Sequence, residues 1–198
     1  MKNIRALLMP LALLLAVAGH YCAAQEPKTS PTPEEFQTKL ESLMSETGAV
    51  IVKGYTRVGS VAGSRGTAFV TAWEVTDATA GRRETGVEVA ISDPAAARPD
   101  ADDERAYIDY DEITLLLKGI DYVARLDSKA TKLSRYEAQY QTRGGLVLVT
   151  FSTPSGQATA ISTEGGRRAR FILRPSGLAE FRNLLESAKQ ALDAPQSQ

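Results

Sequence analysis

Residues 105–123 read RAYIDYDEITLLLKGIDYV, a short strand pattern that runs directly into a helical one. Apolar residues recur at the three- and four-residue spacing that places them on one face of a helix. These residues are Ile113, Leu116, Leu117, Ile120 and Val123. Asp109 and Glu112 have the spacing of a capping box at the start of this helix. The stretch therefore predicts a strand over residues 105–109, followed by an amphipathic helix.

The end of the chain follows the same plan. Residues 168–173 have a strand pattern, and Pro175 suits the first position of a helix, where no backbone hydrogen bond is lost. The apolar stripe of this helix is Leu178, Phe181, Leu185, Ala188 and Leu192. A shift of 65 residues carries Ile113 onto Leu178 and aligns the two stripes. We interpret this agreement as an internal repeat; the alternative is chance, because helical stripes are common.

Strand patterns separated by glycine-rich turns precede each helix. The predicted strands are 49–58, 67–76, 83–91 and 105–109 in the first half, and 136–142, 146–152, 157–162 and 168–173 in the second. Residues 83–91 alternate most clearly, with Val87 and Val89 on one face and Glu88 on the other, as in a half-buried antiparallel strand. We predict an α+β fold. Two β-β-β-β-α units, about 49–127 and 134–194, form an antiparallel sheet packed with two amphipathic helices.

A further short helix is expected before the first strand. Thr32-Pro33-Glu34-Glu35 has the spacing of a capping box, with proline at the first helical position. The apolar residues that follow at helical spacing are Phe36, Leu40, Leu43 and Met44. We expect this helix to dock on the main body, so that residues 33–194 form a single α+β domain. Residues 25–32 are polar and contain proline, which is typical of a flexible tether.

Residues 1–24 have the three parts of a secretory signal peptide. Basic residues come first, an apolar run of about a dozen residues follows, and small residues precede Gln25. We predict cleavage there, export to the periplasm or the extracellular space, and no membrane span in the mature chain. The alternatives are an uncleaved anchor and lipid attachment at Cys22. The leader also contains the only histidine, His20, and the only cysteine.

Loss of the leader would limit the chemistry of the mature protein. Removing Lys2 and Arg5 from 23 basic residues leaves 21 against 24 acidic residues, a net charge of −3. This balance lacks the basic excess of a nucleic-acid-binding protein. Without histidine and cysteine, a site must consist of carboxylates, basic residues, hydroxyl groups or aromatic rings. We predict no cofactor and no metal site, and a protein or a small anionic ligand as partner.

Asp111 and Glu112 are the candidate catalytic residues. Paired carboxylates can share acid and base roles, as in glycoside hydrolysis, so a carboxylate-based hydrolase is one functional hypothesis. The alternative is structural, because acidic residues in the first turn favour the helix dipole. An acidic loop, 100–104, offers oxygen ligands to calcium but lacks the ligand spacing of an EF-hand, which favours a solvated loop.

Arginines in predicted turns are the candidate ligand-binding residues. They are Arg82, Arg83, Arg143, Arg167 and Arg168, with Arg65 in a similar glycine-flanked position. If these turns meet at one end of the sheet, the guanidinium groups could hold an anionic ligand through forked contacts. The alternative is that they keep turns and strand edges soluble.

Aromatic residues on predicted strands suggest a second kind of surface. Tyr55, Trp73, Tyr136 and Tyr140 could stack on a ligand if a sheet face is open, or could form cross-strand pairs in the core. Residues 170–173, RFIL, and 179–184, AEFRNL, resemble the strand–helix end of a PUR repeat. This resemblance implies β-β-β-β-α units and binding of single-stranded nucleic acid.

Three functional hypotheses follow from the sequence. The first is an exported, non-enzymatic binding or interaction protein, because the mature chain lacks histidine, cysteine and a recognisable catalytic motif. The second is the carboxylate-based hydrolase, and the third is the PUR-like binder of single strands. An uncovered sheet face would indicate the ligand surface.

Overall fold

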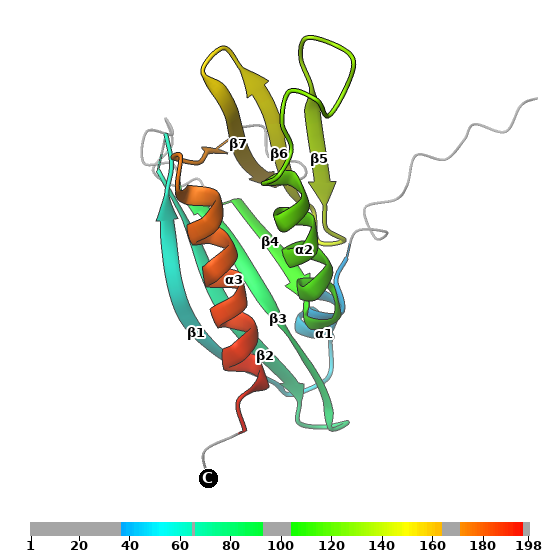
Figure 1. Cartoon of the computed structure of the whole chain (residues 1–198). Coiled ribbons are helices and arrows are strands. Elements are labelled where there is room, and N and C mark those ends of the chain that lie inside the picture. Colours follow the sequence, from blue (N-terminus) through cyan, green and yellow to red (C-terminus); the bar gives the residue numbers. More distant parts are fainter. Residues whose placement is uncertain (1–36, 65, 93–103, 164–170, 196–198) are drawn as a thin grey trace, which may run out of the picture. The chain divides into compact units, whose positions relative to one another are not determined.

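The computed structural model describes residues 37–64, 66–92, 104–163 and 171–195. The first half forms β1 (Ile51–Ala62), β2 (Thr67–Asp77), β3 (Arg82–Ser92), β4 (Glu104–Asp109) and α2 (Tyr110–Val123). The second half forms β5 (Glu137–Gln141), β6 (Leu146–Thr153), β7 (Gly156–Thr163), β8 (Phe171–Ile172) and α3 (Gly177–Asp193). A short helix, α1 (Lys39–Met44), precedes β1 (Figure 1).

The predicted α+β fold of two β-β-β-β-α units is confirmed, but the strands form two sheets and not one. The first sheet has the order β1-β2-β3-β4 and the second the order β5-β6-β7-β8, with antiparallel neighbours throughout. Helix α2 follows β4 directly and separates it from β5, so β5 begins a new sheet and pairs with β6. Between the described parts of the two sheets, one isolated bridge links Gly63 to Leu173.

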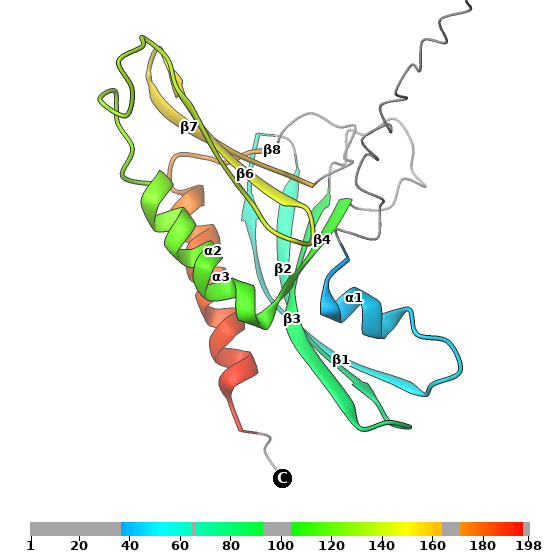
Figure 2. The same cartoon turned by 90° about the vertical axis from the view of Figure 1, so that its right-hand side faces the viewer.

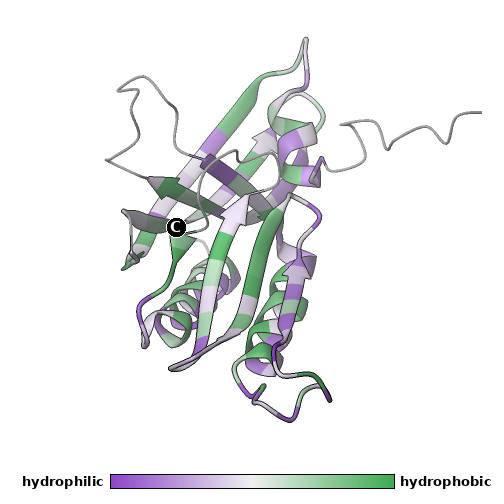
Figure 3. Ribbon diagram, turned by 90° about the horizontal axis from the view of Figure 1, so that it is seen from above, coloured by the Kyte–Doolittle hydropathy of each residue, from purple (hydrophilic) through white to green (hydrophobic). Residues whose placement is uncertain are grey.

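The helices lie on both sides of the first sheet. Figure 2 shows α2 and α3 against one face of this sheet and α1 on the opposite side. The core between the first sheet, the second sheet and these two helices is continuous, and it contains Val70 and Val89 together with Leu148, Ile161 and Phe181. Figure 3 shows hydrophobic and hydrophilic bands alternating along strands, as expected where one face enters a core.

Both helical stripes pack as the sequence predicts. Ile113, Leu116, Ile120 and Val123 of α2 are buried, as are Phe181, Leu185 and Ala188 of α3. The start of α3 differs from the prediction, because Ser176 is the N-cap and Gly177 the first helical residue, so Pro175 precedes the helix. None of the helices in the described ranges is long and apolar enough to cross a membrane.

Strand β1 is longer than predicted. The glycine-rich turn was expected at residues 59–66, whereas the strand continues to Ala62 through a bulge between Arg57 and Gly59. A Cβ atom at Gly59 would lie 2.5 Å from Cδ2 of Leu184. This glycine therefore serves the close approach of α3 to the sheet and not a turn.

Helix α1 confirms a helix before the first strand, but its cap differs from the predicted one. Thr38 is the N-cap and forms a capping box with Glu41; the predicted box at residues 32–35 lies outside the described residues. Asp109 also differs from the prediction, because its side chain does not cap α2. Its two oxygens accept hydrogen bonds from the backbone N–H groups of Lys39 and Leu40, at 3.0 and 3.1 Å. The carboxylate at the start of α2 therefore caps α1.

Asp77 makes the hairpin between β2 and β3 sensitive to acid. Its carboxylate accepts hydrogen bonds from the backbone N–H groups of Ala80 (3.1 Å) and Thr79 (2.8 Å) and from Arg82 (3.0 Å). The bond from Ala80 and the Arg82 guanidinium hold the pKa of Asp77 below its usual range. A lowered folded-state pKa stabilises the protein above the unfolded pKa, about 4, and this contribution is lost as the pH falls through the folded value.

We therefore expect Asp77→Asn to reduce stability at pH 7 and to lose less stability on acidification than the unsubstituted protein. Urea unfolding at about pH 7 and pH 3 measures both effects. Asp127→Asn, in an exposed turn, is the control and should follow the unsubstituted protein. Equal acid losses in the Asp77 variant and the parent would contradict the expectation.

Candidate binding surface on the first sheet

One face of the first sheet is covered only at one end by described residues. Leu40 and Leu43 of α1 pack on Val75, with Trp73 and Tyr107 at the border of this small cluster. Beyond it, no described helix or strand covers the face, which we call the open face. A hollow of about 580 Å³ lies there, lined by Tyr55, Arg57, Thr71, Trp73, Glu88 and Arg105.

Strand register brings these side chains together. Tyr55 of β1 lies opposite Trp73 of β2, and Arg57 lies opposite Thr71. Thr71 in turn lies opposite Glu88 of β3. Since opposite residues of an antiparallel pair share a face, these three strands present one continuous row to the same side.

Two aromatic rings form the apolar part of the surface. The ring centroids of Tyr55 and Trp73 are 4.8 Å apart with an interplanar angle of 31°, and Tyr107 meets Trp73 edge-on at 6.3 Å. Trp73 is half-buried by these neighbours, whereas Tyr55 is 68% exposed. The exposed Tyr55 ring, the outer ring, is therefore available for stacking on a ligand. It packs against the half-buried Trp73 ring, the inner ring.

A buried carboxylate holds the inner ring in place. Glu88 is only 4% exposed, and its oxygens accept hydrogen bonds from Nε1 of Trp73 (2.9 Å) and Nη1 of Arg105 (2.8 Å). Although partial burial opposes the charged form, the Glu88 carboxylate raises the pKa of Arg105. Partial burial and the same carboxylate raise the pKa of Tyr107. Glu88 thus orients one ring and one cation on the open face.

Arg57 supplies a cation without a carboxylate partner among the described residues. Its guanidinium lies 4.5 Å from the centroid of the Phe69 ring, a cation–π contact. Arg105 is also half-exposed, but it is paired with Glu88. The forked donors of Arg57 remain available to an anion next to the exposed tyrosine ring.

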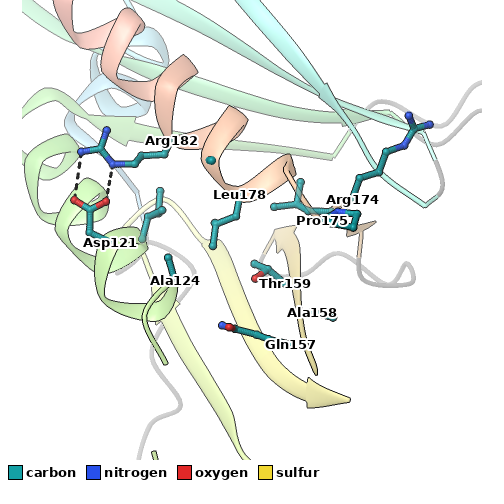
Figure 4. Close-up of a pocket in the computed structure, with 12 residues that line it drawn as sticks. Asp121, Ala124, Gln157, Ala158, Thr159, Arg174, Pro175, Leu178 and Arg182 are labelled. Carbon is teal, nitrogen blue, oxygen red and sulfur yellow. Dashed lines mark hydrogen bonds and ion pairs between the residues drawn. The ribbon is translucent and has the colours of Figure 1, made fainter. Parts of the chain in front are cut away.

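A second hollow lies between α2, α3 and β7, with a volume of about 500 Å³. Figure 4 shows Leu178 and Ala124 facing it, with Gln157 and Thr159 on the side of β7. Asp121 and Arg182 close one end through an ion pair at 2.6 Å. The guanidinium of Arg174 points away from Leu178 in this view.

Apart from Arg174, the polar side chains that line this second hollow have partners within the protein. Gln157 donates to the backbone oxygen of Val123 at 2.8 Å, and Thr159 bonds to Thr150 at 3.0 Å. Arg182 is bound to Glu186 as well as to Asp121. The hollow therefore offers mainly apolar contacts, and the open face is the stronger candidate site.

The predicted turn arginines do not lie on the open face. Arg82 binds Glu46 and Asp77, and Arg83 binds Glu74, all around the hairpin between β2 and β3. Arg143 lies in the turn between β5 and β6 of the second sheet, where Nη1 contacts Asp109 at 2.7 Å. Arg65, Arg167 and Arg168 lie outside the described residues. The three described turn arginines are thus each paired with carboxylates in two separate turns.

The candidate catalytic carboxylates have different partners. Asp111 is exposed and pairs with Nζ of Lys39 at 2.8 Å, a contact that lowers the pKa of Asp111. Glu112 accepts a hydrogen bond from the backbone N–H of Arg143 at 2.8 Å through Oε1, whereas Oε2 is buried without a partner among the described residues. Both side chains join α2 to neighbouring elements.

Sequence reasoning identified the rings but missed the charged residues beside them. Tyr55 and Trp73 were predicted on strands, but Arg57, Glu88 and Arg105 were not proposed as site residues, because their proximity depends on the pairing of four strands. Tyr140 packs instead against Gly119 of α2, and Tyr136 precedes β5. Within the described ranges, no group of three or more metal-ligating side chains is present, and of the acidic loop only Glu104 is described.

Comparisons with protein families, with curated proteins and with solved structures found no match for this chain. The resemblance to a PUR repeat therefore rests on residues 170–184 and on the order of the elements.

Proposed function

We propose that the protein is an exported, non-enzymatic binding protein that holds a small anionic ligand with a ring on the open face. The observation that carries this proposal is the position of Arg57, without a carboxylate partner among the described residues, beside the exposed Tyr55 ring. Export rests on the signal-peptide pattern of residues 1–24.

A sugar acid has the chemistry that this surface accepts. The apolar face of a pyranose ring packs on an exposed aromatic ring, and Tyr55 is held in position by Trp73 behind it. A carboxylate on the sugar can receive two parallel hydrogen bonds from the Arg57 guanidinium. Arg105 lines the same hollow and can bind a second oxygen with the donors that Glu88 leaves available.

Trp73 makes the test direct, because it is the only tryptophan of the chain and lies in the site. We expect trigalacturonate to change the tryptophan fluorescence with saturation, and the neutral maltotriose to have a much weaker effect. Arg57→Ala should weaken binding about tenfold or more, since hydrogen bonds to charged groups contribute roughly 1.5–3 kcal/mol. Tyr55→Ala should also weaken it through loss of stacking.

Tyr122→Ala is the matched control, because Tyr122 is similarly exposed but lies on α2. This variant should bind trigalacturonate like the unsubstituted protein. Unchanged affinity in Arg57→Ala, or equal responses to the acidic and the neutral trisaccharide, would refute the proposed site.

Binding of single-stranded nucleic acid is the second candidate function. Paired rings and arginines on a sheet face are an arrangement that stacks bases and contacts phosphates, and the PUR resemblance points the same way. In this case an oligothymidylate should quench Trp73, with an affinity that falls steeply as salt rises. A net charge of −3 after loss of the leader favours the small ligand over a polyanion.

A carboxylate-based hydrolase is the third candidate and rests on Asp111 and Glu112. Its test is turnover of a glycoside that is lost in both Asp111→Asn and Glu112→Gln. The ion pair of Asp111 with Lys39 and the bond of Glu112 to the Arg143 backbone support a structural role for both residues instead.

A further inference from the structure

The outer edge of β1 is regular and unpaired over residues 51–57 among the described residues. β1 is the edge strand of the first sheet, and its register is with β2 alone. Beyond Ala62 the edge is covered, because the backbone N–H of Ser64 donates to the oxygen of Ile172 at 2.8 Å. The bulge between Arg57 and Gly59 interrupts the middle of the strand. The first half of β1 is therefore available to another strand.

Exposed apolar side chains gather at this same edge. Val50, Val52 and Tyr55 are 64%, 56% and 68% exposed, and they are three of the seven large hydrophobic residues with high exposure in the described part of the chain. Figure 2 shows that the end of the sheet where β1 begins extends away from α2 and α3. These two helices therefore do not cover the sheet there. Edge strands of monomers are commonly protected by proline, by several charges or by short length, and this segment has only Lys53 and Arg57.

We propose that a second copy of this chain pairs with the edge, so that residues 51–57 of the two copies form an antiparallel ladder about a twofold axis. The eight strands of the two first sheets then form one continuous sheet. An axis perpendicular to the sheet keeps the open faces of both copies on the same side. Residues that pair across the axis must therefore share a face. The axis can then lie only at a residue, which faces its own copy, and not between two successive residues.

The length of the free edge and its charges together select one register among these, because a ladder over all of residues 51–57 of both copies is centred on Gly54. An axis at Lys53 would place this lysine opposite its own copy, and an axis at Tyr55 would place Lys53 opposite Arg57. Like charges directly opposite one another destabilise a strand pair. An axis at Gly54 instead places Lys53 opposite Tyr55 of the second copy, so that no like charges lie directly opposite one another. The geometry therefore points to Gly54 as the residue on the axis.

Gly54 is compatible with this position and offers a test of it. A Cβ atom at residue 54 would have only the backbone oxygen of Glu74 within 4 Å, at 3.9 Å, so a larger side chain fits. Opposite residues in an antiparallel pair have Cα atoms about 4.5–5.5 Å apart, within the range that a disulfide can bridge.

We expect Gly54→Cys to form a disulfide-linked dimer under mild oxidation, in a Cys22→Ser background that leaves one thiol in the chain. Val52→Cys is the control: residue 52 is exposed, but it faces Thr56 and not its own copy, so cross-linking should be several-fold weaker. A folded Gly54→Cys protein that stays monomeric, or one that cross-links no better than Val52→Cys, would overturn the proposed register.

The association itself is tested on the unsubstituted protein without ligand. Sedimentation equilibrium over about 1–200 µM should show a shift from the mass of one chain to that of two, since an interface of this size associates weakly. Val52→Lys adds a charge at the edge and should remain monomeric over the same range. A monomer at every concentration would refute the proposal that a second copy pairs with this edge. That result is expected if the edge instead pairs with a strand of another protein. Neither readout depends on the ligand of the open face.

Discussion

Replacing Asp109 with alanine is expected to destabilise the protein by roughly 3 kcal/mol, because a buried and fully bonded carboxylate is lost. Asp109 is 2% exposed and accepts hydrogen bonds from the backbone N–H groups of Lys39 and Leu40 and from Arg143. Its removal leaves the backbone N–H groups of Lys39 and Leu40 and the Arg143 guanidinium without this acceptor, whereas Thr38 still caps Glu41. Urea unfolding at neutral pH measures the loss of stability.

The same variant should also change the environment of Trp73. This side chain packs at the border of the cluster formed by Leu40, Leu43 and Val75. When α1 loses the two hydrogen bonds to Asp109, the ring becomes more solvated, so its emission should shift to longer wavelength before global unfolding. Asp111→Ala is the control, because this neighbour is exposed and its pair with Lys39 contributes about 0–1 kcal/mol. Equal stability of the two variants would contradict the role assigned to Asp109.

Phe181→Ala should be the most destabilising core substitution, with a loss of about 3–5 kcal/mol of unfolding free energy. Phe181 of α3 is fully buried and belongs to the core that both sheets and α2 share. A truncated side chain leaves a cavity at the point where the two repeats meet. Thermal and urea unfolding, followed by circular dichroism, measure the effect.

The shared core also determines how the protein unfolds. Since Leu148 and Phe171 of the second sheet pack in the same cluster as Val89 of the first, both sheets should unfold in one transition. Trp73 fluorescence, which reports on the first sheet, should therefore coincide with the dichroism signal in Phe181→Ala. Phe181→Leu is the matched control and should cost well under half as much. A loss below about 1 kcal/mol in the alanine variant would show that the site repacks.

Local patterns were sufficient to predict the elements of this fold. The apolar stripes and their flanking residues predicted α2 and α3, with helix ends within two residues of those observed. Alternation along β3 correctly placed Val87 and Val89 in the core, but the prediction of a half-buried strand was wrong over residues 86–91, which are buried on both faces. The division into two sheets could not be predicted, because it depends on which strands pair, and strand patterns alone do not contain this information.

The candidate site was only partly predictable for the same reason. Tyr55 and Trp73 are recognisable as aromatic residues on strands, but their contact depends on a register set by the whole hairpin. Asp109 shows a related difficulty: its spacing to Glu112 matches a local cap, but its partners come from a segment 70 and 69 residues earlier. Sequence patterns describe neighbours along the chain, whereas these contacts join distant segments.

The long separation in sequence between Asp109 and α1 affects the order in which the chain folds. A helix of six residues is not stable in isolation, because the free-energy cost of nucleation exceeds the stabilisation from so few hydrogen bonds. Asp109 reaches its place only when β3 and β4 have paired, so α1 must form late although it precedes them in the chain. By the same reasoning, α1 is the element that opens first in the folded protein, and its amides should exchange with solvent faster than those of the strands that it covers.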